Sequence, residues 1–243
     1  MEQLNGQVGV VTGASGGLGR SIALALAAAG MKVVAASRDV TKLATLQEEI
    51  VGSGGGCLTV STDVSDESAV RALFTRIREE YGRVDLLVNN AGLAVGGPAD
   101  ELSFELWRQV LSVNLDGAFL CSRAALAMMK PQKRGRIINI GSVSAKVPRI
   151  HSAPYTTSKF ALEGMTRAMA LDARAYGVAV GILHPGNTDT PIWDSRREVG
   201  EGEGLMPVDE VARMVVTMAS LPPTMNFLEG IVLPVSMPFL GRG

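Results

Sequence analysis

The chain has 243 residues, of which 47% are apolar and 19% charged, and its formal net charge is −1. This length and composition suit one large α/β domain with an ample core, and they exclude a wholly disordered chain. Because the lysines and arginines are scattered and almost balanced by acidic residues, the sequence lacks the basic footprint of a nucleic-acid-binding protein.

Signals for membranes, secretion and metals are weak along the chain. The longest apolar run, Ile22–Ala29, is far shorter than the roughly 20 residues that a spanning helix needs, so we expect no membrane association. The N-terminal residues enter a strand-like segment at once, and we expect no signal peptide. Cys57 and Cys121 have no metal-like spacing, which favours reduced thiols in a cytoplasmic protein without a resident metal.

Short β-rich runs alternate with longer helical patterns. The predicted strands, several of them apolar throughout as in a sheet covered on both faces, are Gln7–Thr12, Met31–Ser37, Cys57–Asp63, Arg83–Gly92, Gly135–Ser142, Gly177–Gly186 and Glu229–Val235. The predicted helices are Gly16–Ala29, Thr41–Val51, Ser65–Glu80, Ser103–Met129, Tyr155–Ala175 and Val208–Leu221. Repeated strand–helix–strand order predicts right-handed crossovers and an α/β fold with one parallel, doubly wound sheet.

A glycine-rich loop, TGASGGLG, joins the first predicted strand to the first helix. Gly13 permits a tight turn, Gly17 leaves room for a pyrophosphate, and Gly19 lets the helix pack closely on the sheet. The N–H groups at the helix N-terminus favour phosphate, so we expect a dinucleotide here, with Ser15 and Leu18 also in contact. A glycine-rich turn without a ligand is the alternative.

The end of the second strand bears on the choice of cofactor. In domains of this kind an acidic side chain there binds the ribose 2′-hydroxyl of NAD, whereas an arginine accommodates the 2′-phosphate of NADP. Ser37 and Arg38 can both bind phosphate, so we expect NADP(H), with NAD(H) as the alternative. Asp39 would repel the phosphate if it faced the ribose, and we expect it to face away. Asp63 and Val64 suit a site around the adenine, and Asp63 equally suits a simple turn.

Further motifs follow in order, each at a strand end or on a facing helix. They are Asn89–Gly92 (NNAG), Asn114, Ser142, the pair Tyr155 and Lys159, and His184–Thr190 (HPGNTDT). With the glycine loop they make the sequence resemble the short-chain dehydrogenase/reductase family from about Gln3 to Thr190. The resemblance implies a single Rossmann-like domain over residues 1–243, a seven-stranded parallel sheet, a nicotinamide cofactor and a homotetramer or homodimer.

The resemblance also implies a catalytic tetrad of Asn114, Ser142, Tyr155 and Lys159. Four residues are about one helical turn, so Tyr155 and Lys159 share a helix face. The ammonium and the oxidised nicotinamide would lower the pKa of the tyrosine, Ser142 would orient the substrate oxygen, and Asn114 would hold a water linked to the lysine. The cofactor contacts implied are Gly13, Gly17, Gly19, Asn90, Ala91, Gly92, Tyr155, Lys159, Pro185, Gly186, Thr188 and Thr190.

The substrate side is less defined by the sequence. We expect the pocket to be lined by Ser142, Ser144, His151, Tyr155, Asn187 and Trp193. Residues 190–207 are charged and glycine-rich without a clear period, and we expect a mobile substrate lid or a solvated loop. Neither histidine has a partner at the spacing of a hydrolase triad, and His184 is interpreted as structural.

These observations predict an NADP(H)-dependent oxidoreductase that interconverts a ketone or aldehyde and an alcohol, with a small-molecule substrate. One alternative is a β-ketoacyl carrier-protein reductase, which would need a basic surface to bind its acidic carrier. A small basic cluster could serve this purpose or could simply be solvated at the end of a helix: Lys130, Lys133, Arg134 and Arg136. The other is a catalytically silent NADP-binding sensor, which would need the glycine loop but not Tyr155.

Overall fold

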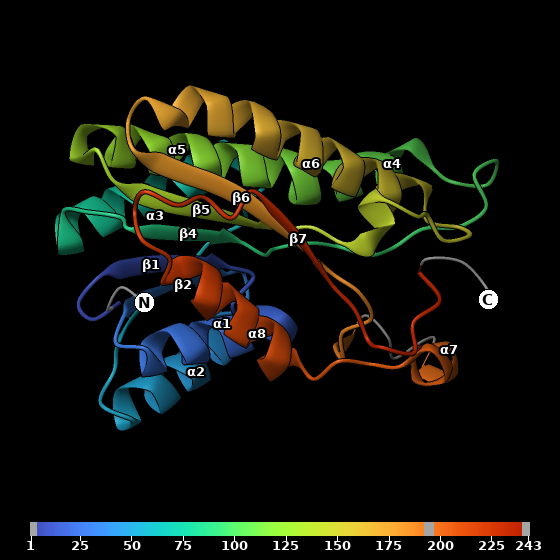
Figure 1. The fold of residues 1–243 in the computed structure, drawn as a ribbon, viewed down its shortest axis with the longest axis horizontal. Helices are drawn as coiled ribbons and strands as arrows, with labels where there is room; N and C mark the ends of the chain where they lie inside the picture. The colour runs from blue at the N-terminus through green and yellow to red at the C-terminus, as the bar shows by residue number, and fades with distance from the viewer. Residues whose placement is uncertain (1–3, 192–196, 240–243) are drawn as a thin grey trace.

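The computed structural model describes residues 4–191 and 197–239. Seven parallel strands form one sheet in the order β3-β2-β1-β4-β5-β6-β7 (Figure 1). The strands are β1 (Val8–Thr12), β2 (Lys32–Ser37), β3 (Gly56–Ser61), β4 (Leu86–Asn89), β5 (Gly135–Ile140), β6 (Val178–Pro185) and β7 (Glu229–Val232). The strand order reverses between β1 and β4, where sheets of this type bind their ligands. The predicted parallel, doubly wound sheet is confirmed.

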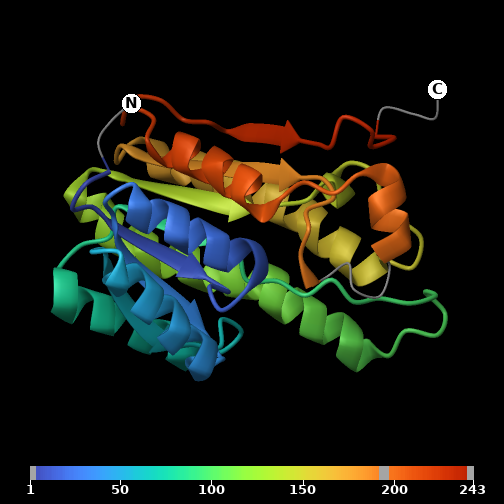
Figure 2. The same cartoon turned by 90° about the horizontal axis from the view of Figure 1, so that it is seen from below.

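Helices cover both faces of the sheet (Figures 1 and 2). One layer consists of α1 (Gly17–Ala28), α2 (Val40–Gly52) and α8 (Val208–Ala219), and the other of α3 (Glu67–Tyr81), α5 (Gly117–Gln132) and α6 (Ala153–Arg174). On β2, Val33 and Ala35 join the core under the first layer, whereas Val34 and Ala36 join the core under the second. This alternation explains why the central strands are apolar throughout.

The long helix predicted from Ser103 is interrupted. It consists of α4 (Phe104–Leu111), a π-helical turn η1 (Ser112–Asp116) and α5, and Asn114 lies buried in the π turn. π turns inside helices commonly mark functional sites. Within the described residues, this stretch alone is long and apolar enough to cross a membrane, but half of its most apolar window is buried in the fold, as in the core helix of a globular protein.

Of the segment expected to be a mobile substrate lid or a solvated loop, residues 190–207, residues 192–196 lie outside the described residues, and the part that follows them is helical in its first turns. It contains a short helix, α7 (Arg197–Glu203), which lies beyond the carboxyl ends of the strands (Figure 1). Two contacts hold its end: Met206 forms a bridge with Thr188, and the Ser236 hydroxyl donates to the Glu203 carbonyl at 2.9 Å. These partners come from distant parts of the chain, so the local sequence pattern gave no sign of the helix.

Candidate active site

A cavity of about 850 Å³ lies at the carboxyl ends of the central strands. This volume is in the range of known small-molecule sites. It brings together every predicted cofactor residue: Gly13, Ser15, Gly17, Leu18, Gly19, Ser37, Arg38, Asp63, Val64, Asn90, Ala91, Gly92, Tyr155, Lys159, Pro185, Gly186, Thr188 and Thr190. Of the predicted substrate residues, it is also lined by Ser142, Ser144, His151 and Asn187. Trp193 lies outside the described residues.

The glycine loop forms the floor at one end of the cavity. Gly13 and Gly17 adopt left-handed backbone angles, with φ of 66° and 49°, which glycine tolerates best. A Cβ on Gly19 would lie 2.3 Å from the Gly13 carbonyl oxygen, so only glycine allows this close approach. Gly16 caps α1 without a side-chain hydrogen bond, and the first turn has no acidic residue. The N-terminus of α1 therefore fits an anionic phosphate.

Thr12 ties this loop to the segment after β4. Its hydroxyl accepts from the backbone N–H groups of Asn90 and Ala91, at 3.0 and 3.1 Å. The Asn90 amide donates to the Thr12 carbonyl oxygen at 3.0 Å. The preceding Asn89 points into the core instead, where its amide donates to Asn139 at 2.8 Å. The two loops that flank the strand-order reversal are thus held in one fixed arrangement.

Asp39 faces away from the cavity, as predicted. Its carboxylate caps α2 by accepting from the Lys42 backbone N–H at 3.0 Å, and this bond is the main cause of its lowered pKa. At the end of β2, the Ser37 hydroxyl donates to the Ser15 hydroxyl at 2.8 Å, which links the strand end to the glycine loop. The acidic group that would repel a 2′-phosphate is therefore held by the next helix.

Arg38 is exposed at the same edge of the cavity. Its guanidinium lies 3.9 Å from the Asp63 carboxylate. Asp63 also accepts from the Ser65 hydroxyl at 2.6 Å, and that bond contributes most to lowering the pKa of Asp63, ahead of the charge of Arg38. Asp63 thus forms a turn and also lines the cavity, and its place beside an adenine stays a prediction. Arg38 remains able to reach a ligand from the rim.

Tyr155 and Lys159 lie on the first two turns of α6, on the wall of the cavity. The Lys159 ammonium is 5.5 Å from the centre of the Tyr155 ring and donates to the Ile140 carbonyl oxygen at 2.8 Å. Burial lowers the pKa of Lys159 to about 8. Burial also raises the pKa of Tyr155, opposed by a hydrogen bond from Ser142. The groups of the protein alone do not lower the pKa of this tyrosine, because desolvation of the phenolate outweighs them, and the lowering expected from the ammonium together with an oxidised nicotinamide stays a prediction.

Ser142 follows β5 on the same wall. Its hydroxyl oxygen accepts from the Ser144 backbone N–H at 3.1 Å. This contact uses an acceptor position, so the hydroxyl proton can still be donated, either to Tyr155 or to an oxygen in the cavity. Ser144, which was also expected in the substrate pocket, therefore contributes through its backbone to the orientation of Ser142.

Asn114 is buried behind the wall and does not line the cavity. Its amide pairs with the backbone of Leu93, accepting from the N–H at 2.7 Å and donating to the carbonyl at 2.9 Å. It also donates to the Ser158 hydroxyl at 3.0 Å, which in turn donates to the Tyr155 carbonyl at 2.6 Å. Leu93 and Ser158 were missed from the sequence, although Ser158 directly precedes Lys159. With its amide engaged in this way, Asn114 connects the loop after β4 to the tyrosine helix.

The mouth of the cavity contains an ion pair that was not expected from the sequence. Arg149, which lines the cavity, forms an ion pair with Glu203 at the end of α7. Asn187 bonds both partners, accepting from Arg149 at 3.1 Å and donating to Glu203 at 3.0 Å. Because Arg149 and Glu203 are 54 positions apart, no local pattern could reveal this link.

The basic cluster considered as a carrier-docking patch is not a single surface. Arg136 is buried, and its guanidinium donates to the carbonyls of Leu221 and Met225 at 3.2 and 3.0 Å. Lys130 lies over the Tyr176 ring, 4.6 Å from its centre. The cluster precedes and begins β5, at the amino ends of the strands, whereas the cavity is at their carboxyl ends. These four residues therefore do not form one free basic surface beside the cavity, and a docking role for them stays a prediction.

Comparisons with known proteins agree with this geometry. The family model described as short chain dehydrogenase matches residues 7–200. A 3-oxoacyl-(acyl-carrier-protein) reductase from Synechocystis sp. is 38% identical over 187 residues, covering 76% of each chain. A 3beta-hydroxysteroid dehydrogenase from Mediterraneibacter gnavus is 36% identical over 193 residues, covering 79% of this chain and 70% of the relative. The crystal structure of a metagenomic short-chain oxidoreductase in complex with NADP superposes with a TM-score of 0.85 at 35% identity, covering 96% and 99% of the two chains.

Proposed function

The chain belongs to the short-chain dehydrogenase family, and on this premise we propose that it uses NADP(H), with Tyr155 as the proton donor and acceptor. The enzyme is an oxidoreductase that interconverts a carbonyl group and an alcohol with a nucleotide cofactor. One observation carries the residue assignment: Ser142, Tyr155 and Lys159 line the same cavity as the glycine loop.

In the reductive direction, bound NADPH supplies a hydride to the carbonyl carbon. Tyr155 donates its phenolic proton to the carbonyl oxygen, so that an alcohol forms and a phenolate is left. Ser142, whose oxygen already accepts from the Ser144 N–H, donates its hydroxyl proton to the same carbonyl oxygen and orients it. Stabilising the charge that develops on this oxygen is the main task of such donors.

Lys159 stabilises the phenolate left by that step. Its pKa of about 8 keeps it mostly protonated at neutral pH, so a buried positive charge lies beside the phenol. Its bond to the Ile140 carbonyl fixes the ammonium in place. Both amide N–H groups of Asn114 already donate, to the Leu93 carbonyl and the Ser158 hydroxyl, so a relay water held by Asn114 would have to donate to one of its oxygen atoms.

The activity assay follows NADPH oxidation with ethyl acetoacetate, acetophenone and cyclohexanone as probes, comparing wild-type protein with Tyr155→Phe. We expect the variant to lose about 100-fold or more of kcat, the usual contribution of a general acid, while NADPH binding measured by fluorescence is unchanged. Turnover by Tyr155→Phe at the wild-type rate would refute the assignment. NADPH binding without turnover by either protein would favour the sensor.

The preference for NADP(H) is tested at Arg38. Because Asp39 is held by α2 and Arg38 is exposed at the cavity edge, Arg38→Asp should weaken NADPH binding at least tenfold and leave NADH binding almost unchanged. Arg71→Asp, an exposed position on α3, is the matched control for the change in charge. Unchanged cofactor selectivity in Arg38→Asp would overturn the phosphate contact.

The substrate is a small-molecule carbonyl or alcohol. Similarity to the Synechocystis 3-oxoacyl-(acyl-carrier-protein) reductase supports a β-ketoacyl substrate, whereas similarity to the 3beta-hydroxysteroid dehydrogenase supports a steroid. Activity with acetoacetyl carrier protein far above that with ethyl acetoacetate would establish the carrier-linked alternative. By family analogy we also propose a cytoplasmic homotetramer or homodimer, and light scattering measures the oligomer directly. The expected substrate lid, residues 190–207, includes residues 192–196, which lie outside the described residues, and it stays a prediction.

A further inference from the structure

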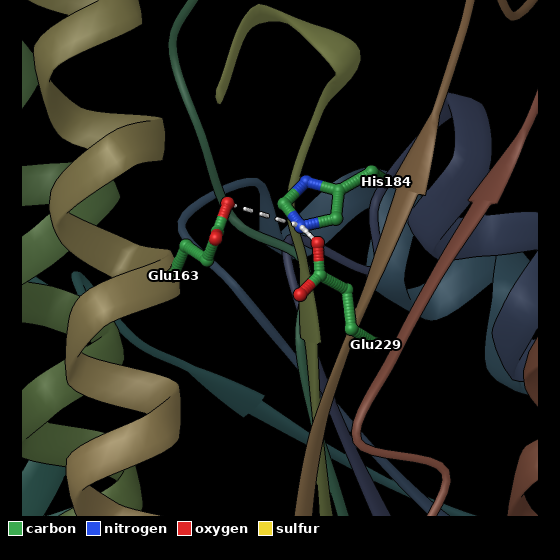
Figure 3. Close-up of side chains that lie close together, drawn as sticks. All are labelled: Glu163, His184 and Glu229. Carbon is green, nitrogen blue, oxygen red and sulfur yellow. Dashed lines mark ion pairs between the residues drawn. The ribbon is translucent and has the colours of Figure 1, made fainter. Parts of the chain in front are cut away.

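Behind the wall of the cavity, His184 lies in a cluster that no step above uses. It is on β6, immediately before Pro185, and is fully buried. Its Nε2 atom faces Glu163 of α6 and Glu229 of β7, at 3.7 Å from a carboxylate oxygen of each (Figure 3). Nε2 makes no closer hydrogen bond within the described part of the chain.

Two cations balance the two carboxylates. The Lys146 ammonium is 2.7 Å from Glu163 and also forms an ion pair with Glu229. Arg167 bonds the same two residues at 2.6 and 2.8 Å. The three ligand atoms of Glu163, His184 and Glu229 lie within 4.8 Å of one another, a spacing that suits a metal ion. However, Lys146 already supplies the positive charge between the carboxylates, so the cluster fits an internal ion-pair network better.

The other side of the imidazole contacts the peptide of Ser142. The Ser142 N–H donates to Nδ1 at 3.2 Å, and the Ser142 carbonyl oxygen lies 2.9 Å from the same atom. The neighbouring Gly141 makes this contact possible, because a Cβ there would lie 2.4 Å from Nδ1. The ring therefore lies directly against the backbone turn that presents the Ser142 hydroxyl.

The same network reaches the helix of the acid–base pair. Tyr155, Lys159 and Glu163 are spaced four residues apart on α6, so their side chains share one face. Glu163 therefore connects the helix that carries the tyrosine to His184, and His184 connects to Ser142. The His184 imidazole therefore connects Ser142 to the helix of Tyr155, and these are the two residues that donate to the carbonyl oxygen of the substrate.

We propose that His184 is a positioning residue for the reaction: its Nε2–H faces Glu163 and Glu229, and its Nδ1 accepts the Ser142 N–H and thereby fixes the Ser142 hydroxyl. The Ser142 carbonyl oxygen, 2.9 Å from Nδ1, favours a proton on Nδ1, but a lone pair on Nε2 would then face the two carboxylates at 3.7 Å, and for this reason we assign the proton to Nε2. Burial lowers the pKa of His184, which agrees with a neutral ring at neutral pH. The role in catalysis rests on the proposed function, whereas the tautomer does not.

Nitrogen-15 NMR of histidine-labelled protein with NADPH reads the tautomer without any substrate. The sequence has two histidines, and a His151→Gln variant assigns the signals. We expect the His184 proton on Nε2 in the wild type and a mixture of tautomers in the double variant of Glu163→Gln and Glu229→Gln. A proton on Nδ1 in the wild type would overturn the proposal.

Kinetics with NADPH and ethyl acetoacetate test the positioning role. His184→Leu fills similar space without an acceptor, whereas the Oδ1 atom of His184→Asn can take the place of Nδ1. We expect kcat to fall about 10- to 100-fold in His184→Leu and to recover to within about threefold of wild type in His184→Asn, with NADPH affinity unchanged in both. Equal kcat in all three proteins, or equal loss in both variants, would overturn the role.

A milder change covers the possibility that substitutions at His184 prevent folding. Glu229→Gln retains the volume and removes one of the two carboxylates, and we expect kcat to fall about threefold or more. Glu210→Gln breaks an exposed ion pair with Arg213 on α8 and is the matched control. If Glu229→Gln keeps the wild-type kcat, as the control Glu210→Gln should, the proposal fails. Absence of turnover by the wild type on any probe would refute the proposed function instead, and the NMR result would still decide the tautomer.

Discussion

Burial of the Lys159 ammonium makes the stability of the enzyme depend on pH in a specific way. The pKa of Lys159 falls from 10.5 to about 8 because of desolvation. At 1.36 kcal/mol per tenfold change in proton affinity, burying the charged form costs about 3 kcal/mol of unfolding free energy. This cost is fully present below pH 8, where the lysine is charged in both states. Between pH 8 and 10.5 the native state loses the proton first, so the wild-type protein is stabilised as the pH rises.

Lys159→Met removes this dependence. The variant keeps the length of the side chain and loses the charge together with the bond to Ile140, so at pH 7 we expect its free energy of unfolding to exceed that of the wild type by about 1 kcal/mol. Urea unfolding at pH 7.0 and 9.5 should show the wild type gaining about 2 kcal/mol relative to the variant. Other titrating groups are common to both proteins and cancel in this difference. A difference that does not change with pH would refute the burial of a charged lysine.

Three further substitutions or treatments test other parts of the site. Gly19→Ala places a Cβ 2.3 Å from the Gly13 carbonyl oxygen, so in urea unfolding we expect it to lower the free energy of unfolding by about 1–3 kcal/mol, and we also expect weaker NADPH binding. The control is Gly16→Ala, whose Cβ would meet no atom within 4 Å and which should lower the free energy of unfolding by less than about 1 kcal/mol. Glu203→Gln should release α7 from the cavity mouth, which a Glu-specific protease would detect as faster cleavage there, with NADPH affinity unchanged. Burial raises the thiol pKa of Cys57 to about 11 and of Cys121 to about 12, so neither should react with iodoacetamide at pH 7.5 unless urea is added.

The strands and the glycine loop were predictable because their signals are local. Apolar runs covered on both faces identify β1 and β2 directly, and Gly13 and Gly19 are required by backbone angles and close approaches within one short turn. Tyr155 and Lys159 were recognisable for the same reason, since one helical turn separates them. Such features depend on neighbours in the sequence.

The π turn at Asn114 was not predictable in this way. Helical periodicity runs through the segment from Ser103 to Met129, and the weak helix formers around Asn114 do not distinguish a π turn from a regular helix. The turn coincides with bonds from Asn114 to Leu93, 21 positions earlier, and to Ser158, 44 positions later. A sequence window that covers one helix contains neither partner.

His184 shows most clearly how the fold supplies what the sequence omits. The sequence favoured a structural role because no partner stands at a recognisable spacing, and in the structure its partners come from the turn after β5, from α6 and from β7. Strand order explains this: β6 lies between β5 and β7, so a residue at its end can contact the Ser142 turn on one side and Glu229 on the other. Glu163 approaches from the helix that also carries Tyr155. The His184 imidazole contacts the Ser142 turn, α6 and β7 at the same time, and it therefore holds the Ser142 hydroxyl in one direction relative to all three. A substitution that only fills the volume of the ring would leave that hydroxyl without a fixed direction.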